Sequence, residues 1–139
     1  MIVIHNQFMK KFALAFVVIC VGCGGSGGGS SSPTGPSPFA GNYNGQFNAP
    51  GFDDGSMQLS IASNGTITGL VFSNALSESG TLAGRVATDG VSSINATFPS
   101  YGTGNIHSTV TLTNNVFNGT GTESWKGSNH AITYSLQAQ

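Results

Sequence analysis

The chain has 139 residues, the usual length of one domain, and only 6% of them are charged. Beyond the Lys10-Lys11 pair, its only cations are Arg85 and Lys126. Proteins that bind nucleic acids present many Lys and Arg side chains to the phosphate backbone, so this composition argues against a nucleic-acid partner.

Residues 1–22 are predicted to be an export signal. Lys10-Lys11 supplies the positive charge of such a signal, and the apolar segment 12–22 has the expected length of roughly 7–15 residues. A transmembrane helix needs about 20 apolar residues, so this segment is too short to be one. Met9 lies directly before the lysine pair, which favours translation from Met9 over translation from Met1.

The end of this signal, Cys20-Val21-Gly22-Cys23, resembles the lipobox of bacterial lipoproteins, which places a small residue before an acceptor cysteine. The resemblance implies cleavage between Gly22 and Cys23 and a covalent lipid on the Cys23 thiol. Cys20 stands where the family usually has leucine. Because the bulky Ile19 precedes Cys20, the expected lipid acceptor is Cys23.

Removal of the signal leaves Cys23 as the only cysteine, so no intramolecular disulfide is expected. Each buried CH₂ group of a lipid chain stabilises membrane attachment by about 0.8 kcal/mol, so the three fatty chains that the resemblance implies would hold the protein on the membrane. In lipoproteins, Asp after the acceptor cysteine favours the inner membrane, and this chain has Gly24 there. The resemblance therefore implies a lipid-anchored protein of the cell envelope, in the outer membrane where the organism has two membranes. The covalent lipid is the only cofactor expected.

Residues 23–38 are predicted to be the lipidated cysteine followed by a flexible tether. Gly and Ser dominate the first part and Pro recurs in the second, and no side chain is large and apolar enough to pack. The glycines do not form a phosphate-binding loop, because the Gly-Lys-Ser/Thr sequence of such a loop is missing.

Residues 39–139 are predicted to be one all-β domain. Apolar and polar residues alternate, and turn signals recur at intervals of roughly 8–12 residues. Three of these signals are Asn64-Gly65, Asp89-Gly90 and Asn114-Asn115. Asn64-Gly65 predicts a type I′ hairpin turn. The inward-facing residues expected of the successive strands are Phe39, Gly41, Tyr43, Gly45 and Phe47; Met57, Leu59 and Ile61; Ile67, Gly69 and Val71; Leu82, Gly84 and Val86; Ile94, Ala96 and Phe98; Ile106, Val110 and Leu112; Phe117, Gly119 and Gly121; and Ile132, Tyr134 and Leu136.

About eight consecutive strands with short turns favour an antiparallel up-and-down meander closed into a barrel, with a β-sandwich as the alternative. Thr, Ser, Asn and Gln dominate the outward positions, which argues against a membrane-spanning barrel. The segments Gly65–Val71 and Gly80–Val86 are near copies, and each has an inward glycine, Gly69 or Gly84, at the same place. Such glycines make room for tight bends or for large side chains of other strands.

In the rhythm of its strands and in the segments Asn64–Gly69 and Phe117–Gly119, the domain resembles avidin-like and lipocalin-like barrels. It also resembles the C-terminal barrels of glycine-tethered surface lipoproteins that bind transferrin or complement factor H. The resemblance implies an interior that is filled by side chains or holds one small ligand. Avidin holds biotin with several tryptophans, whereas Trp125 is the only tryptophan here, so the resemblance assigns no binding residues.

The sequence predicts neither a metal site nor a catalytic site. His107 falls on a polar face, His130 begins the last strand, and the domain has no cysteine to join them around zinc. Most acidic residues fall in predicted turns, and no two form the carboxylate pair of a glycosidase. These residues are Asp53, Asp54, Glu78, Asp89 and Glu123. Within residues 39–139 the nucleophile sequence Gly-x-Ser-x-Gly is also missing, so we expect no enzymatic activity.

Three aromatic residues, Trp125, Tyr43 and Tyr134, are the candidate ligand contacts. Trp125 either covers the barrel mouth as part of the core or stacks on a ligand. Leu70 and Phe72 alternate out of phase with the inward residues of their strand, so they form a small exposed apolar patch or are covered by a loop.

The resulting hypothesis is a lipid-anchored, non-enzymatic barrel that binds a small apolar ligand inside it or a macromolecule on its surface. A structural envelope protein without a discrete ligand is the alternative, and a hydrolase with an unrecognised site is the third candidate. An apolar cavity favours the small ligand. A filled interior with an exposed patch favours the macromolecular partner.

Overall fold

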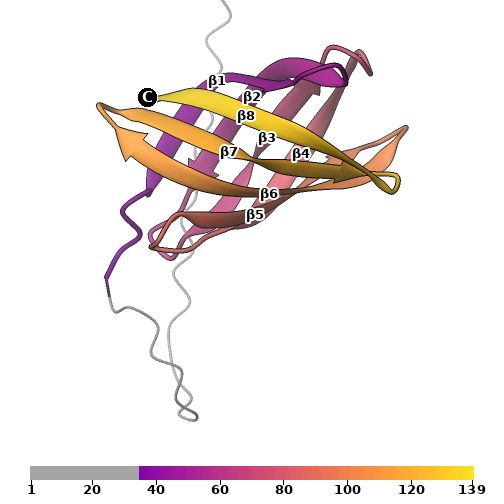
Figure 1. The fold of residues 1–139 in the computed structure, drawn as a ribbon. Coiled ribbons are helices and arrows are strands. Elements are labelled where there is room, and N and C mark those ends of the chain that lie inside the picture. Colours follow the sequence, from indigo (N-terminus) through magenta and orange to yellow (C-terminus); the bar gives the residue numbers. More distant parts are fainter. Residues whose placement is uncertain (1–34) are drawn as a thin grey trace, which may run out of the picture. The chain divides into compact units, whose positions relative to one another are not determined.

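The computed structural model describes residues 35–139, and nearly all of them lie in strands or in the turns between strands. Each strand pairs antiparallel with the next, and the last pairs with the first, which closes a single barrel (Figure 1). The predicted all-β meander barrel is therefore confirmed. The strands are β1 (Gly41–Ala49), β2 (Asp53–Ile61), β3 (Thr66–Ser73), β4 (Glu78–Val86), β5 (Val91–Phe98), β6 (Gly102–Thr113), β7 (Val116–Trp125) and β8 (Ser128–Ala138).

Closure depends on the pairing of β1 with β8, in which Tyr43 lies opposite Ala138 and Asn48 opposite Thr133. Every strand thereby has a hydrogen-bonded partner on both sides. Backbone N–H and C=O groups are satisfied around the whole ring, and no long strand edge is left to pair with another chain. This explains why so many short, weakly apolar strands form one stable unit.

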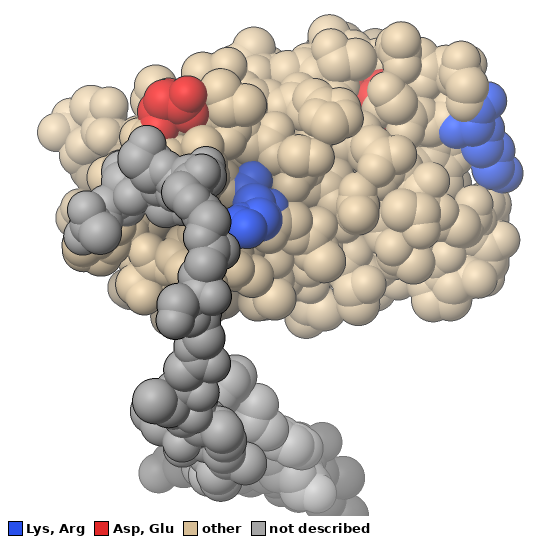
Figure 2. All heavy atoms as spheres, turned by 90° about the horizontal axis from the view of Figure 1, so that it is seen from below, with Lys and Arg blue, Asp and Glu red and all other residues tan. Residues whose placement is uncertain are grey.

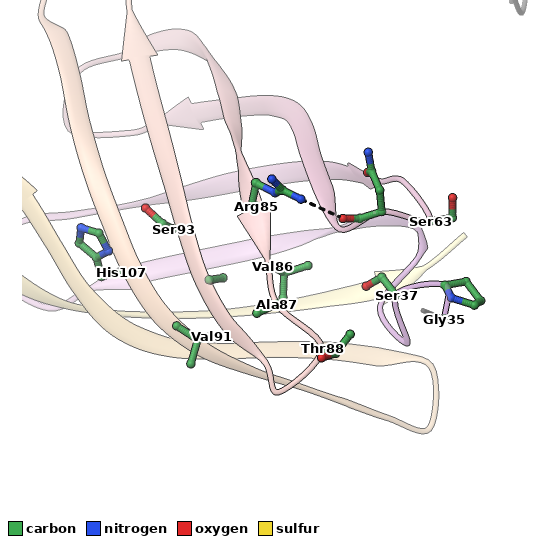
Figure 3. A pocket seen from close by; sticks show the side chains of 13 residues that line it. Gly35, Ser37, Ser63, Arg85, Val86, Ala87, Thr88, Val91, Ser93 and His107 are labelled. Atoms are coloured by element: carbon green, nitrogen blue, oxygen red, sulfur yellow. Dashed lines mark hydrogen bonds between the residues drawn. The ribbon is translucent and has the colours of Figure 1, made fainter. Parts of the chain in front are cut away.

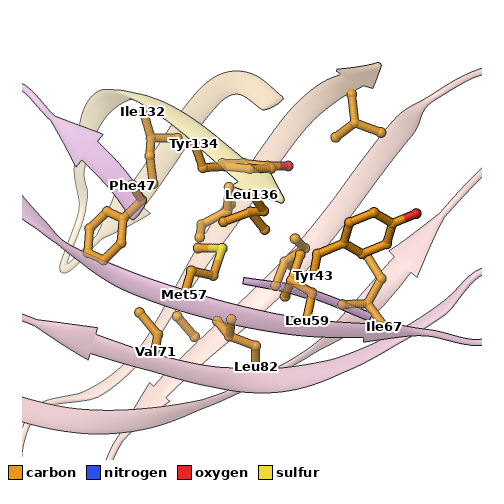
Figure 4. Close-up of a cluster of buried hydrophobic side chains, with 14 of the residues drawn as sticks. Tyr43, Phe47, Met57, Leu59, Ile67, Val71, Leu82, Ile132, Tyr134 and Leu136 are labelled. Atoms are coloured by element: carbon orange, nitrogen blue, oxygen red, sulfur yellow. The ribbon is translucent and has the colours of Figure 1, made fainter. Parts of the chain in front are cut away.

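Buried and exposed residues alternate along every strand, as the sequence predicts, and the buried ones fill the barrel. Met57 and Leu59 of β2 point into the same interior as Tyr134 and Leu136 of β8 (Figure 4). Two residues that were predicted to face inward are exposed: Gly41, the first residue of β1, and Leu112, with 38% of its surface exposed. Leu112 is the larger of the two. It lies beyond the last residue of β6 that pairs with β5, so no strand covers it on that side.

The inward glycines make room for neighbouring groups in two ways. A Cβ atom on Gly84 would lie only 2.8 Å from the Cα atom of Ile94 and closer still to a β5 carbonyl, so the two backbones approach there. Gly69 lies in the same way against β2. Gly119 instead lies under the ring of Tyr134, its partner on β8, and Gly104 lies under Trp125. The expected room for large side chains therefore occurs at Gly119 and Gly104, whereas at Gly69 and Gly84 the neighbouring backbone takes the space.

The predicted type I′ turn at Asn64-Gly65 is wrong. A type I′ turn needs positive φ at both central residues, and of these two only Gly65 has it, at 81°. The loop is longer: the amide of Gly65 donates to the carbonyl of Ala62 (2.9 Å). Asn114-Asn115, with φ angles of 52° and 63°, forms the two-residue connection that fits type I′.

The two ends of the barrel carry different residues. The end that we call the closed end contains the turns 62–65, 87–90 and 114–115, together with residues 35–40 before β1. The end that we call the acidic end contains the turns 50–52, 74–77, 99–101 and 126–127. The acidic residues near these four turns are Asp53, Asp54, Glu78 and Glu123.

Residues 35–40 close their end of the barrel. Phe39 is buried, and its ring meets the ring of Phe117 edge-on at a centroid distance of 6.0 Å. The hydroxyl of Tyr43 donates to the carbonyl of Phe39 (2.9 Å), and the amide of Ser37 donates to the carbonyl of Ser63 (2.6 Å). The last residues of the predicted tether therefore pack against the barrel.

Candidate functional site

Two of the predicted site residues lie outside the described residues. They are Gly22 and Cys23, the expected cleavage and lipidation positions. Cleavage and acylation therefore stay predictions. The three aromatic candidates are described, and the structure places them in two different regions of the barrel.

Tyr43 and Tyr134 lie in the core. Both rings pack on Phe117, at centroid distances of 5.0 and 6.0 Å. The hydroxyl of Tyr134 hydrogen-bonds with that of Ser108 (2.6 Å), which hydrogen-bonds with that of Ser92 (2.6 Å). Burial raises the pKa of both tyrosines. These side chains fill the barrel interior and satisfy its polar groups, so neither is free to contact a ligand in this conformation.

Trp125 lies at the acidic end and covers the core there, in edge-on contact with Phe98 at a centroid distance of 5.7 Å. Beside it is a small pocket of about 40 Å³. The pocket combines an apolar wall with two carboxyl groups. Its main lining residues are Phe52, Leu76, Phe98, Trp125, Asp53 and Glu123. We call it the Glu123 pocket.

Glu123 is the unexpected residue of this pocket. Its side chain is only 7% exposed, and its Oε2 atom is buried without a hydrogen-bond partner among the described residues. Burial, and secondarily the negative charge of Asp53, raise the pKa of Glu123 to about 7. The sequence does contain a signal for it. The alternation that turns Phe117 and Gly119 inward reaches Glu123 two positions after Gly121.

Most acidic residues were expected in turns, and this prediction is wrong. Asp89 alone lies in a turn, whereas the other four lie in strands: Asp53 and Asp54 in β2, Glu78 in β4 and Glu123 in β7. The turn before β2 consists of residues 50–52, and Asp53 begins β2, where it pairs with Ala49. Its Oδ1 atom accepts hydrogen bonds from the amides of Asp54 (2.8 Å) and Ala75 (3.0 Å), which fixes the carboxylate at the pocket. The structure thus brings together two carboxyl groups that sequence analysis did not pair.

The histidines are separate from each other. His107 is exposed on the outer face of β6, as predicted. His130 is half-buried at the acidic end, where its ring stacks on Phe52 at a centroid distance of 3.8 Å. Within residues 35–139, no group of three or more His, Cys, Asp or Glu side chains is close enough to hold a metal ion.

A larger groove of about 890 Å³ lies on the outside of the closed end (Figure 3). One wall is formed by residues 35–37, and the floor is the outer side of β4, β5 and β6. Arg85, Ser93 and His107 are consecutive cross-strand neighbours on that floor. The guanidinium of Arg85 donates to the carbonyl of Asn64 (3.5 Å). The groove is open, and its lining combines hydroxyl side chains with apolar ones such as Val86 and Val91. Residues 35–37 are the first ones described.

The outer surface of the barrel carries few charges, and the face drawn in Figure 2 is mostly neutral. Leu70 and Phe72 are exposed on the outside of β3, by 55% and 40%. Their neighbours on β2 and β4 are polar residues such as Gln58 and Thr81. The predicted exposed apolar patch therefore exists among the described residues, and no described loop covers it.

Comparisons with family models, with curated proteins and with solved structures gave no match for this chain. Among residues 35–139 there is no helix long and apolar enough to cross a membrane. Function is therefore inferred from the barrel's own residues and from the signal-like sequence before it.

Proposed function

We propose that this chain is a lipid-anchored protein of the bacterial cell envelope whose tethered barrel binds a macromolecular partner on its outer surface. The observation that carries the proposal is the filled interior beside an exposed apolar pair. Core side chains occupy the inside of the barrel, whereas Leu70 and Phe72 stand on the outside without a covering element. Exposed apolar side chains next to each other on a polar surface are typical of contact sites.

A small apolar ligand inside the barrel is the weaker candidate, because Phe117, Met57 and Leu136 are fully buried in the space that it would need. A hydrolase is weaker still. Asp53 and Glu123 resemble a pair of catalytic carboxyl groups, one of them with a raised pKa. Their pocket of about 40 Å³, however, is far smaller than the roughly 300–1,000 Å³ of common ligand pockets.

The anchor is tested by Cys23→Ser, which removes the expected acceptor thiol. The variant should accumulate as an uncleaved precursor or leave the membrane fraction, because no fatty chain then holds it. Cys20→Ser is the matched control and should fractionate like the parent chain. A Cys23→Ser chain that remains mature and membrane-bound would contradict the anchor.

The partner surface is tested by placing a photo-reactive amino acid at Phe72 in living cells, with Val91 as the control position. Val91 is also an exposed apolar residue, at 58%, but it lies on β5 rather than on β3. We expect one discrete cross-linked product from position 72 that disappears when Leu70→Ser is added. Equal products from both positions, or none from position 72, would contradict the proposal.

A further inference from the structure

The Glu123 pocket contains a polar group that the described part of the barrel does not satisfy. A buried carboxyl oxygen without a partner is costly, and native structures keep few such groups. Glu123 Oε2 is in this state, with the side chain more than nine-tenths buried and lining the pocket. The unpaired oxygen is therefore an independent indication that something else binds there.

The surroundings of Glu123 favour a cation over a neutral or negative group. Asp53 lines the same pocket with a second carboxylate, and Trp125 and Phe52 add aromatic rings. Carboxylates bind ammonium groups through charge-assisted hydrogen bonds, and aromatic faces attract them further. His130, paired with Glu123 on β8, is the remaining titratable neighbour, and its ring is stacked on Phe52.

The chain's own cations do not occupy this position. Among residues 35–139 the cationic side chains besides histidine are Arg85, at the closed end, and Lys126. Lys126 lies in the turn of the acidic end, but its ammonium group is placed over the ring of Tyr101, 5.8 Å from the centroid. An external cation would therefore meet no competing group from the described residues.

The size of the pocket selects among cations. A volume of about 40 Å³ is close to the roughly 30 Å³ that one water molecule occupies. A primary ammonium group is about as large as water and fits, whereas a trimethylammonium group does not. A divalent metal ion bound by only two carboxyl groups keeps several water ligands, and a pocket of about 40 Å³ has no room for them.

We propose that the Glu123 pocket binds the primary ammonium group of an unbranched alkyl chain, held by the carboxylates of Glu123 and Asp53. This chemistry is shared by free alkylamines and by the lysine side chain. The site is separate from the outer patch on β3, so it goes beyond the function proposed above.

Trp125 provides a direct readout, because it is the only tryptophan of the chain and lines the pocket. The purified full-length chain is titrated at about pH 8, where Glu123 is mostly ionised, with n-butylammonium chloride. n-Butanol and tetramethylammonium chloride are the matched controls at equal ionic strength. We expect a saturable change in tryptophan emission with butylammonium and none with either control.

Glu123→Gln keeps the shape of the side chain and removes its charge, so we expect it to weaken butylammonium binding by about tenfold or more. Asp53→Asn should weaken it as well. Glu78→Gln is the control variant, since Glu78 lies at the same end but binds Ser100 and does not line the pocket. It should keep the parent affinity within about twofold.

Two further probes distinguish the sources of the ammonium group. Cadaverine represents a free amine, and a Gly-Lys-Gly peptide blocked at both ends represents a lysine side chain. Binding of either supports the site and identifies its source. Equal responses to butanol and butylammonium, no response to any amine, or a Glu123→Gln chain that binds like the parent would each overturn the proposal.

Discussion

The closed end and the acidic end of the barrel are both covered by an aromatic side chain, but they differ in whether the polar groups buried there have hydrogen-bond partners. At the closed end, Phe39 covers the core, and Tyr43 satisfies the Phe39 carbonyl. Further inside, Ser92, Ser108 and Tyr134 satisfy one another. At the acidic end, Trp125 covers the core, but Glu123 is buried beside it without a partner for Oε2.

This difference matters for the stability of the barrel. A buried carboxyl group in an apolar wall opposes folding unless it is protonated or paired. The closed end shows that this chain can satisfy buried polar groups when only stability is required. At the acidic end, the unpaired Glu123 lowers the stability of the chain, and the proposed ammonium binding gives this cost a reason. Each of the following variants tests one side of this contrast.

The largest effect is expected at the closed end from Phe39→Ala. The change removes a buried ring that packs on Phe117, and it should lower the free energy of unfolding by about 3 kcal/mol. Phe72→Ala removes an exposed ring and should stay within about 0.5 kcal/mol of the parent chain. Urea denaturation measures the free energy of unfolding of both variants. Similar losses for the two variants would mean that residues 35–40 do not close the barrel.

A smaller loss is expected from Gly84→Val, close to the closed end on β4. The new side chain would collide with the backbone of β5 at Ile94, at a cost of roughly 1–3 kcal/mol. Ala83→Val is the matched control, because residue 83 faces outward and valine favours strands. A Gly84→Val midpoint in urea at or above the parent value would refute the close approach of the two strands.

The smallest effect is expected from Tyr134→Phe, which removes one hydroxyl from the satisfied cluster. Ser108 loses a hydrogen bond of 2.6 Å inside the barrel, so the variant should lose about 1 kcal/mol in thermal or urea denaturation. Tyr101→Phe, at an exposed tyrosine, should change nothing measurable. If Tyr134→Phe is equally neutral, the closed end is not stabilised by this cluster.

Alternation along the chain is enough to predict the barrel and most of its core, because each strand has one face inside and one in water. The same alternation places Glu123 inside, although most acidic residues were expected in turns. The sequence could not predict that Glu123 and Asp53 line the same pocket. These residues lie on β7 and β2, and only the closure of β8 on β1 brings the two strands to one pocket.

The central claim is that Glu123 is held at the acidic end at a cost in stability, and urea denaturation at two pH values tests it most directly. The folded-state pKa of Glu123 is raised from 4.5 to about 7. The folded chain therefore keeps a proton that the unfolded chain loses, and stability falls as the pH rises from about 4.5 to about 7.

The quantity compared is the difference in the free energy of unfolding between the parent chain and Glu123→Gln, because contributions common to both chains cancel in it. We expect the free energy of unfolding of Glu123→Gln, relative to that of the parent, to rise by roughly 2 kcal/mol between about pH 5 and about pH 8. Glu78→Gln should show no such gain. A difference between parent and Glu123→Gln that is the same at both pH values, or that favours the parent more at the higher pH, would contradict the account.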